Sequence, residues 1–546
     1  MGASALWWMI ALGFLSFIVA MLPPDTTAPF WMLVRAHDVG AAWLGVAVLV
    51  LARLLTPLFA RCDWPRLAAF IERHLLVLCA LSFGFYAALS FWTYHHVPLA
   101  MDEYCALTQS RSFVAGHSSA HVPPALLDWI MATGHRGEFF AIAQSSGNYT
   151  PVYWPGLAIL QTPFTALGVP WLCNPALGAL ALWGVHRLTF RLSSSREAAA
   201  WAWALMLASP VIAINAASFY AMPAHLAFNI FYCLLLLRDD RRGAFAAGLV
   251  GGFALVLHNP APHLAFALPW LGFVAWKRRR LLLPLLLGYL VFALPLGFGW
   301  SAFLDGFDAS RYAQSARAAG GGPPFVEVLG RLAAIVSLPS LELVLARLTG
   351  LAKTVVWAVP GIAVIAWLGW RGARADEARP SRLLAASLLT TFGLYWLVRF
   401  DQGHGWGFRY LHSAWFVLAV LGGCYLARAP QNVRAFFAAL CALSLTILLP
   451  QRAWQVEGFI AHHRAQVPTA KAPVSITFIN GAHGLFTLDL LQNDPFLRND
   501  NWRLKSQGTE RNAGLAREYL IDPKLEQSGV WGEIWNGSAL RHPKQK

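Results

Sequence analysis

The sequence has 546 residues, of which 57% are apolar and only 13% are charged, and its mean hydropathy is +0.50. These values exclude a soluble protein of average composition and predict an all-α polytopic membrane protein. The net charge of +15 is typical of nucleic-acid binding proteins, but most arginines lie in short connections between apolar runs, so we expect no nucleic-acid partner.

The apolar runs predict the transmembrane helices. A helical span needs roughly 20 apolar residues, and about thirteen runs, some of them short, fit this requirement. The first run lacks a basic leader and a small-residue cleavage site, so we expect it to be retained. The predicted spans are 5–22, 41–59, 74–93, 172–191, 198–216, 222–237, 244–258, 261–276, 281–299, 352–370, 383–399, 409–427 and 433–450.

The distribution of arginine predicts the orientation in the membrane. Lys and Arg are retained in short cytoplasmic loops, and every second connection is basic if the N-terminus is cytoplasmic. Examples are the connections that contain Arg61 to Arg73, Arg187 to Arg196 and Lys277 to Arg280. This orientation places three longer regions outside, namely residues 94–171, 300–351 and 451–546.

These outer regions predict the domain organisation. We expect a transmembrane module over residues 1–450, including the outer loop 94–171 with short helices on the membrane surface. A small C-terminal α/β domain is expected over 451–546, with a strand at Val474–Ile479 and a short helix at Leu485–Leu491. Gly320–Gly322, followed by two prolines, predicts a flexible turn.

Two groups of residues in the outer loop are candidates for chemistry. Asp102, Glu103 and Tyr104 follow the apolar run Leu75–Trp92, and carboxylates near hydrocarbon often mark a site. Two solvated charges at a helix end are the alternative. The aromatic stretch Tyr149 to Trp154, which includes Tyr153, could stack on a sugar or an isoprenoid chain, or form an interfacial aromatic belt.

This order of features resembles the GT-C superfamily of polyprenyl-phosphate-sugar-dependent glycosyltransferases. The resemblance covers roughly residues 74–300 and is closest to the bacterial branch related to protein mannosyltransferases and the aminoarabinose transferase of lipid A. In most members the acidic loop follows the first span, whereas two extra spans precede it here, which preserves sidedness. The resemblance implies the bacterial inner membrane, a periplasmic C-terminal domain, and inverting transfer of a sugar to a glycan, lipid or protein acceptor.

The resemblance also implies roles for the acidic pair. Asp102 corresponds to the catalytic base that takes a proton from the acceptor hydroxyl, and Glu103 assists it or helps to hold a metal. A carboxylate within hydrogen-bond reach of a hydroxyl can act as a general base. No cofactor is certain, and a divalent metal ion is an open alternative because some relatives use one. The histidines and acids between His95 and His121 lack a zinc-like spacing.

Two further groups lie at predicted outer turns. His404, Arg409 and Tyr410 lie among glycines that let the backbone approach a ligand, and Arg409 at a helix start predicts a site for the lipid phosphate. An arginine touching lipid headgroups is the alternative. His258 and Asn259 are predicted sugar contacts. The rival functions are a transporter or flippase for a lipid-linked glycan and a non-catalytic subunit of polysaccharide assembly.

Overall fold

The computed structural model describes residues 2–307 and 338–542 and divides the chain into two compact units. The first, called the helical unit, contains Met1–His96, Trp171–Pro295 and Ala333–Val456. The second, called the mixed unit, contains Val97–Pro170, Leu296–Leu332 and Glu457–Lys546. The turn predicted at Gly320–Gly322 lies outside the described residues.

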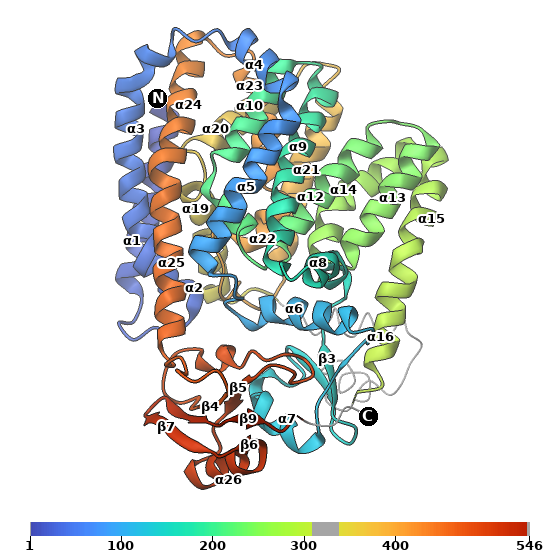
Figure 1. The fold of residues 1–546 in the computed structure, drawn as a ribbon. Helices are drawn as coiled ribbons and strands as arrows, with labels where there is room; N and C mark the ends of the chain where they lie inside the picture. The colour runs from blue at the N-terminus through green and yellow to red at the C-terminus, as the bar shows by residue number, and fades with distance from the viewer. Residues whose placement is uncertain (1, 308–337, 543–546) are drawn as a thin grey trace. The chain divides into compact units, whose positions relative to one another are not determined.

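The helical unit is built from apolar helices that pack along one another. In Figure 1, α1, α3 and α24 run side by side, and α13 packs against α15. The helices are α1 (Gly2–Met21), α2 (Pro29–Leu33), α3 (Val39–Phe59), α4 (Trp64–Arg73), α5 (Leu75–Tyr94), α9 (Cys173–Ser193), α10 (Arg196–Leu207), α11 (Pro210–Ala216), α12 (Met222–Leu236), α13 (Arg241–Leu255), α14 (Ala261–Lys277), α15 (Leu282–Phe292), α19 (Leu341–Val356), α20 (Ile362–Arg371), α21 (Ala378–Tyr395), α22 (Arg409–His412), α23 (Phe416–Leu426), α24 (Gln431–Leu443) and α25 (Leu449–Ala465).

Five helices in the described part of the chain are long and apolar enough to cross a membrane, and a sixth follows if the bent pair α10 and α11 is one span. Others, such as Met222–Leu236, are apolar but shorter. A multi-pass membrane protein is therefore supported, whereas thirteen spans remain a prediction. The five are Ala3–Met21, Pro29–Phe59, Leu75–Tyr94, Arg279–Leu304 and Gln431–Ala465.

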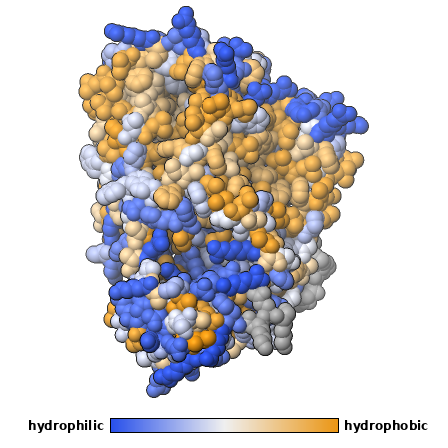
Figure 2. Space-filling view, viewed as in Figure 1, coloured by the Kyte–Doolittle hydropathy of each residue, from blue (hydrophilic) through white to orange (hydrophobic). Residues whose placement is uncertain are grey.

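The basic connections gather at one end of the helical unit. Arg196 Nε lies 2.5 Å from Glu72 Oε2, and Arg434 Nη1 lies 2.8 Å from Glu197 Oε2. These ion pairs join connections that are distant in the chain. In Figure 2, hydrophilic residues gather at this end, and apolar residues cover most of the visible side of the helices.

The predicted spans 352–370 and 433–450 differ from the structure, and the spans 198–216 and 409–427 are each divided between two helices. The span 352–370 is wrong: α19 ends at Val356 and α20 begins at Ile362. Pro360 lacks an amide hydrogen and Gly361 has a φ of +85°, a conformation that interrupts a helix. The last helix does not end at residue 450. It continues to Ala465, and its residues become polar after the predicted span.

The described residues of the mixed unit combine helices with three small sheets. Their strand orders are β1-β3-β2, β5-β4-β8-β7 and β6-β9; β4 and β5 pair in parallel, and the other named strands pair antiparallel. The elements are α6 (Met101–Val114), β1 (Ala120–His121), α7 (Leu127–Ile130), β2 (Phe140–Ala143), β3 (Asn148–Pro151), α8 (Gly156–Ala166), α16 (Gly299–Leu304), β4 (Ser475–Ile479), β5 (Asn501–Lys505), α26 (Thr509–Tyr519), β6 (Leu520–Ile521), β7 (Lys524–Gly529), β8 (Gly532–Asn536) and β9 (Ala539–Leu540).

The core of the mixed unit contains residues from both the outer loop and the tail. The rings of Trp129 and Phe478 meet edge to face with centroids 5.6 Å apart, and Trp502 is fully buried in the same cluster. The strand predicted at Val474–Ile479 is confirmed as β4, whereas the helix predicted at Leu485–Leu491 is only a 3₁₀ turn, Thr487–Leu490. The shared core packs against α6 and so fixes the helix that carries the acidic residues.

Candidate functional site

Asp102 lies in the first turn of α6, where the chain enters the helix from extended backbone at Ala100. Its Oδ1 accepts a hydrogen bond from the Tyr153 hydroxyl at 2.5 Å, and both side chains are half-buried. The helix dipole stabilises a carboxylate at this position. The structure therefore presents an oriented carboxylate that is partly open to its surroundings.

Glu103 has a different environment from Asp102. It is fully buried, and its Oε2 accepts a hydrogen bond from the Leu99 backbone nitrogen at 2.7 Å. A glutamate in the third position of a helix that reaches back to the preceding backbone resembles half of a capping box. The contact fixes the entry of the chain into α6. In the structure, Glu103 holds the turn that presents Asp102.

Tyr104 connects this helix to the tail within the mixed unit. Its hydroxyl donates to the Asn493 carbonyl oxygen at 2.7 Å and accepts from the Asn493 amide at 2.8 Å. Burial raises the pKa of Tyr104, so the hydroxyl stays protonated and keeps the donor role. Both contacts fix α6 against a segment almost 400 residues away (sequence separation 389).

The predicted aromatic residues have separate positions. Tyr149 is buried in the core and donates to the Pro495 carbonyl oxygen at 3.2 Å, and burial raises its pKa well above the usual value. Trp154 is half-buried against a second apolar cluster. Tyr153 contacts Asp102, and its carbonyl oxygen accepts from Trp300 Nε1 at 3.1 Å. Of these three, Tyr153 is the one that the structure joins to the acidic residues by a hydrogen bond.

The residues proposed for a metal do not converge. Within residues 2–307 and 338–542, no three His, Cys, Asp or Glu side chains form a group that could hold a metal ion. Glu103 already accepts from Leu99. The described residues thus form no metal centre of their own, and we derive no step through one.

The glycine turn of the helical unit, residues 401–409, places Arg409. Gly403, Gly405 and Gly407 have φ values of +61°, +135° and +69°. A Cβ on Gly405 would lie 2.1 Å from Arg409 Cδ, and one on Gly407 would lie 2.6 Å from Val211 Cγ2. The close approach expected from these glycines is therefore to the protein's own side chains.

Arg409 is half-buried and held by this turn. Its Nη1 donates to the carbonyl oxygens of Gln402 at 3.0 Å and His404 at 2.7 Å. Its guanidinium carbon lies 4.3 Å from the centre of the Tyr220 ring. The helix that it begins, α22, is only four residues long. A helix this short adds little dipole, so the positive charge of Arg409 is the feature of this turn that can attract an anion.

The other residues predicted to bind substrate also make contacts within the protein itself. Tyr410 stacks on Tyr395 with ring centroids 4.3 Å apart and donates to the Asp401 carbonyl oxygen at 2.5 Å. Asn259 Oδ1 accepts from the Ala261 amide at 3.1 Å, and His258 is half-buried between α13 and α14. His404 contributes its carbonyl oxygen to Arg409.

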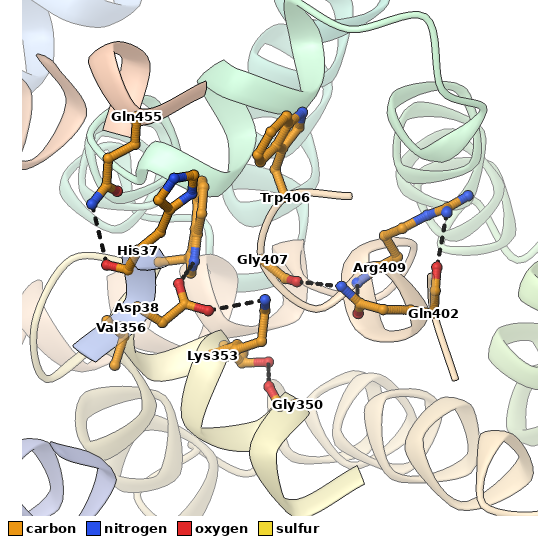
Figure 3. Close-up of polar contacts among 12 residues, drawn as sticks. His37, Asp38, Gly350, Lys353, Val356, Gln402, Trp406, Gly407, Arg409 and Gln455 are labelled. Carbon is orange, nitrogen blue, oxygen red and sulfur yellow. Dashed lines mark hydrogen bonds and ion pairs between the residues drawn. The ribbon is translucent and has the colours of Figure 1, made fainter. Parts of the chain in front are cut away.

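A buried ion cluster was missed by the sequence analysis. Asp38 lies 2.9 Å from Lys353 Nζ and 3.1 Å from Arg452 Nη1, and all three side chains are 1% exposed. Figure 3 shows Lys353 pointing at the Asp38 carboxylate. The available signal was that these charges lie inside or beside apolar runs, where charged residues usually have a function.

Comparisons with known proteins give the fold. No family model and no curated protein matches the sequence. ArnT from Cupriavidus metallidurans bound to undecaprenyl phosphate matches the structure with a TM-score of 0.52 at 14% identity, over 86% of this chain and all (100%) of that one. The chain has the GT-C fold. The GT-C fold predicted from the sequence is thus confirmed.

Two other solved structures are similar at lower scores. The apo state of ArnT from Cupriavidus metallidurans has a TM-score of 0.49 at 13% identity and covers 85% of this chain and 98% of that one. The Archaeoglobus fulgidus oligosaccharyltransferase in its apo form has a TM-score of 0.41 at 13% identity, and the match covers 69% of this chain and 56% of that one.

Proposed function

We propose that this chain is an inverting glycosyltransferase of the bacterial inner membrane. It transfers a sugar from a polyprenyl-phosphate carrier to a glycan, lipid or protein in the periplasm. The GT-C fold supports this proposal, as does the match to the full length of ArnT, which was solved with undecaprenyl phosphate. The basic end of the helical unit supports a cytoplasmic N-terminus.

The proposal rests mainly on the position and environment of Asp102. Its carboxylate is oriented by the Tyr153 hydroxyl, half-buried, and placed at the start of α6. A general base needs a fixed carboxylate within reach of the hydroxyl whose proton it takes. Asp102 meets the first requirement, and the acceptor hydroxyl supplies the second when it binds.

The proposed reaction is a single displacement at the anomeric carbon. The acceptor oxygen forms a bond to this carbon while its proton passes to the Asp102 carboxylate. The bond between the anomeric carbon and the phosphate oxygen breaks, and polyprenyl phosphate leaves with the electron pair. Attack from the side opposite the phosphate inverts the configuration, and no sugar-enzyme intermediate forms.

Arg409 is the proposed partner of the phosphate. A phosphate leaving group gains negative charge as its bond to the sugar breaks, and a fixed guanidinium stabilises that charge. The two carbonyl oxygens that accept from Nη1 fix the plane of the guanidinium. Arg409 would thus contribute both to binding of the donor and to stabilisation of the leaving phosphate.

Substitution of Gly405 tests the placement of Arg409. In Gly405→Ala the new Cβ would collide with the Arg409 side chain at a φ that L-residues rarely adopt. We expect binding of undecaprenyl phosphate to weaken by about tenfold or more, since a lost hydrogen bond to a charged group costs roughly 1.5–3 kcal/mol. Gly403→Ala is the control for backbone strain, because its φ is also positive while no atom lies within 4 Å of its Cβ. Equal affinities of the two variants would contradict the assignment.

Tyr153 and Tyr149 are expected to separate activity from stability. Tyr153→Phe removes the hydrogen bond to Asp102, so we expect the turnover rate to fall by about tenfold with little change in thermal stability. Tyr149→Phe leaves a buried carbonyl oxygen without its donor, so the free energy of unfolding should fall by about 1 kcal/mol while turnover is kept. Turnover assays and thermal unfolding of both variants check this contrast, and the opposite pattern would count against it.

Reconstitution tests the proposed reaction class. The full chain in proteoliposomes is given a polyprenyl-phosphate sugar that is labelled in the sugar, together with cell-envelope material as acceptor. A transferase releases polyprenyl phosphate and moves the label to the acceptor. A flippase moves the intact lipid between leaflets without breaking the sugar-phosphate bond. An assembly subunit does neither.

A further inference from the structure

The buried ion cluster has no part in the proposed chemistry. Asp38 ends a π-helical turn, Val34–Asp38, between α2 and α3. Lys353 lies on α19 and Arg452 on α25, so three segments distant in the chain meet at one carboxylate. Arg452 also contacts Gln455 Oε1, at 3.0 Å.

Stability alone does not explain these charges. Replacement of a buried ion pair by apolar residues of similar volume is often neutral or stabilising. Charged residues in membrane spans usually serve a function, and π-helical turns are frequent at functional sites. If the ion cluster has a function, it must act through contacts with another part of the helical unit.

Trp357 provides that connection. Its Nε1 donates to Asp38 Oδ1 at 2.6 Å, and the Arg452 guanidinium carbon lies 4.1 Å from the centre of its ring. The ring lies with its centroid 6.4 Å from that of Trp406, and Trp357 Cβ lies 3.6 Å from where a Cβ on Gly407 would stand. Trp357 thus contacts both the ion cluster and the glycine turn.

The glycine turn connects Trp357 to Arg409 through hydrogen bonds of Gln402. Gln402 Nε2 donates to the Gly407 carbonyl oxygen at 2.9 Å, and Gln402 Oε1 accepts from the Arg409 amide at 3.0 Å. In the view of Figure 3, Gly407 lies between Lys353 and Arg409. A shift of Trp406 and Gly407 would therefore move the backbone that holds Arg409.

Trp406 is fixed from other directions as well. Its Nε1 donates to the Tyr94 hydroxyl at 2.5 Å, and its carbonyl oxygen accepts from Asn215 Nδ2 at 3.2 Å. The Trp357 carbonyl oxygen accepts from the Val211 amide at 2.9 Å, and Val211 packs against Gly407. The turn is thus held by buried groups whose positions depend on one another.

We propose that Asp38 is a positioning residue for phosphate binding. Lys353 and Arg452 fix its carboxylate, the carboxylate fixes the Trp357 indole, and the indole fixes the turn that places Arg409. The inference rests on the proposed role of Arg409 as the partner of the lipid phosphate.

Trp357→Phe tests this path, because it removes the indole N–H and leaves the ion pairs of Asp38 intact. The dissociation constant for undecaprenyl phosphate is measured on the full chain for wild type, Trp357→Phe, Arg409→Gln and the double variant. We expect Trp357→Phe to weaken binding about tenfold, as for loss of a hydrogen bond to a charged group. The double variant should bind no more weakly than Arg409→Gln, because both changes act through one contact.

Trp8→Phe is the matched control. Trp8 is also fully buried in the helical unit, and its Nε1 donates to the Ala42 carbonyl oxygen at 2.7 Å. We expect Trp8→Phe to lower thermal stability without weakening phosphate binding. Trp406→Phe is a second variant on the proposed path and should weaken phosphate binding with the ion cluster unchanged.

The outcomes separate this inference from the proposed function. Additive losses in the double variant, or equal effects of Trp357→Phe and Trp8→Phe, would make the cluster purely structural and overturn the inference. The same follows if Arg409→Gln weakens binding and Trp357→Phe does not. If Arg409→Gln itself has no effect, the phosphate role of Arg409 fails and the inference fails with it.

Discussion

Asp102→Asn is expected to lower the rate of sugar transfer by about 10²- to 10⁴-fold, the usual contribution of a general base. The asparagine side-chain oxygen can still accept from the Tyr153 hydroxyl, so the geometry of the site should persist. The change therefore removes the proton acceptor with little effect on folding. The rate is measured as transfer of labelled sugar in proteoliposomes, at matched amounts of folded protein.

Asp128→Asn is the control for this prediction. Asp128 lies in the same unit, but its side chain is 61% exposed and pairs with Arg136 at the surface. Exposed ion pairs contribute little to stability, so this variant should transfer sugar at the wild-type rate. Equal rates for both asparagine variants would exclude Asp102 as the base and favour a transport or assembly function.

Arg409→Gln is expected to weaken binding of undecaprenyl phosphate by about 10- to 100-fold, because a hydrogen bond to a charged group contributes roughly 1.5–3 kcal/mol. Turnover should fall as well, since the leaving phosphate loses its cation. Arg409→Lys should recover only part of the loss, because an ammonium group cannot reproduce the planar fork of donors. Binding is measured by titration of the purified chain with the lipid.

Arg399→Gln is the control for Arg409, since Arg399 is an exposed arginine close by in the chain. It should bind undecaprenyl phosphate as wild type does. If both variants lose the same affinity, the effect is a general one of positive charge near lipid headgroups. That result would remove Arg409 from the proposed mechanism.

The helical elements were predictable where apolar runs are continuous. The run Leu75–Trp92 corresponds to α5, Leu75–Tyr94. The acidic residues after it were also found, because two charges beside a span are conspicuous. The break at Trp357–Gly361 was missed, since average hydropathy does not register a proline and a glycine with positive φ. The end of α25 was missed for a different reason, because its residues are polar and hydropathy no longer marks the helix there.

The environments of the site residues depended on contacts that the sequence does not reveal. Tyr149 looked like part of an exposed aromatic loop, but its hydroxyl bonds to Pro495, 346 positions later. Asp38 and Trp357, 319 positions apart, form the bond that ties the ion cluster to the glycine turn. The roles of Tyr153 and Glu103 also became visible only through their partners.

Mass spectrometry of lipid-linked sugars and envelope glycans tests the central claim most directly. Cells carry the wild-type chain, a deletion, or Asp102→Asn at matched membrane expression. The proposed function predicts that both mutants accumulate the same polyprenyl-phosphate sugar and lack that sugar in one glycan, lipid or protein. Wild-type levels of donor and product in cells with Asp102→Asn, alongside a defect in the deletion, would contradict it.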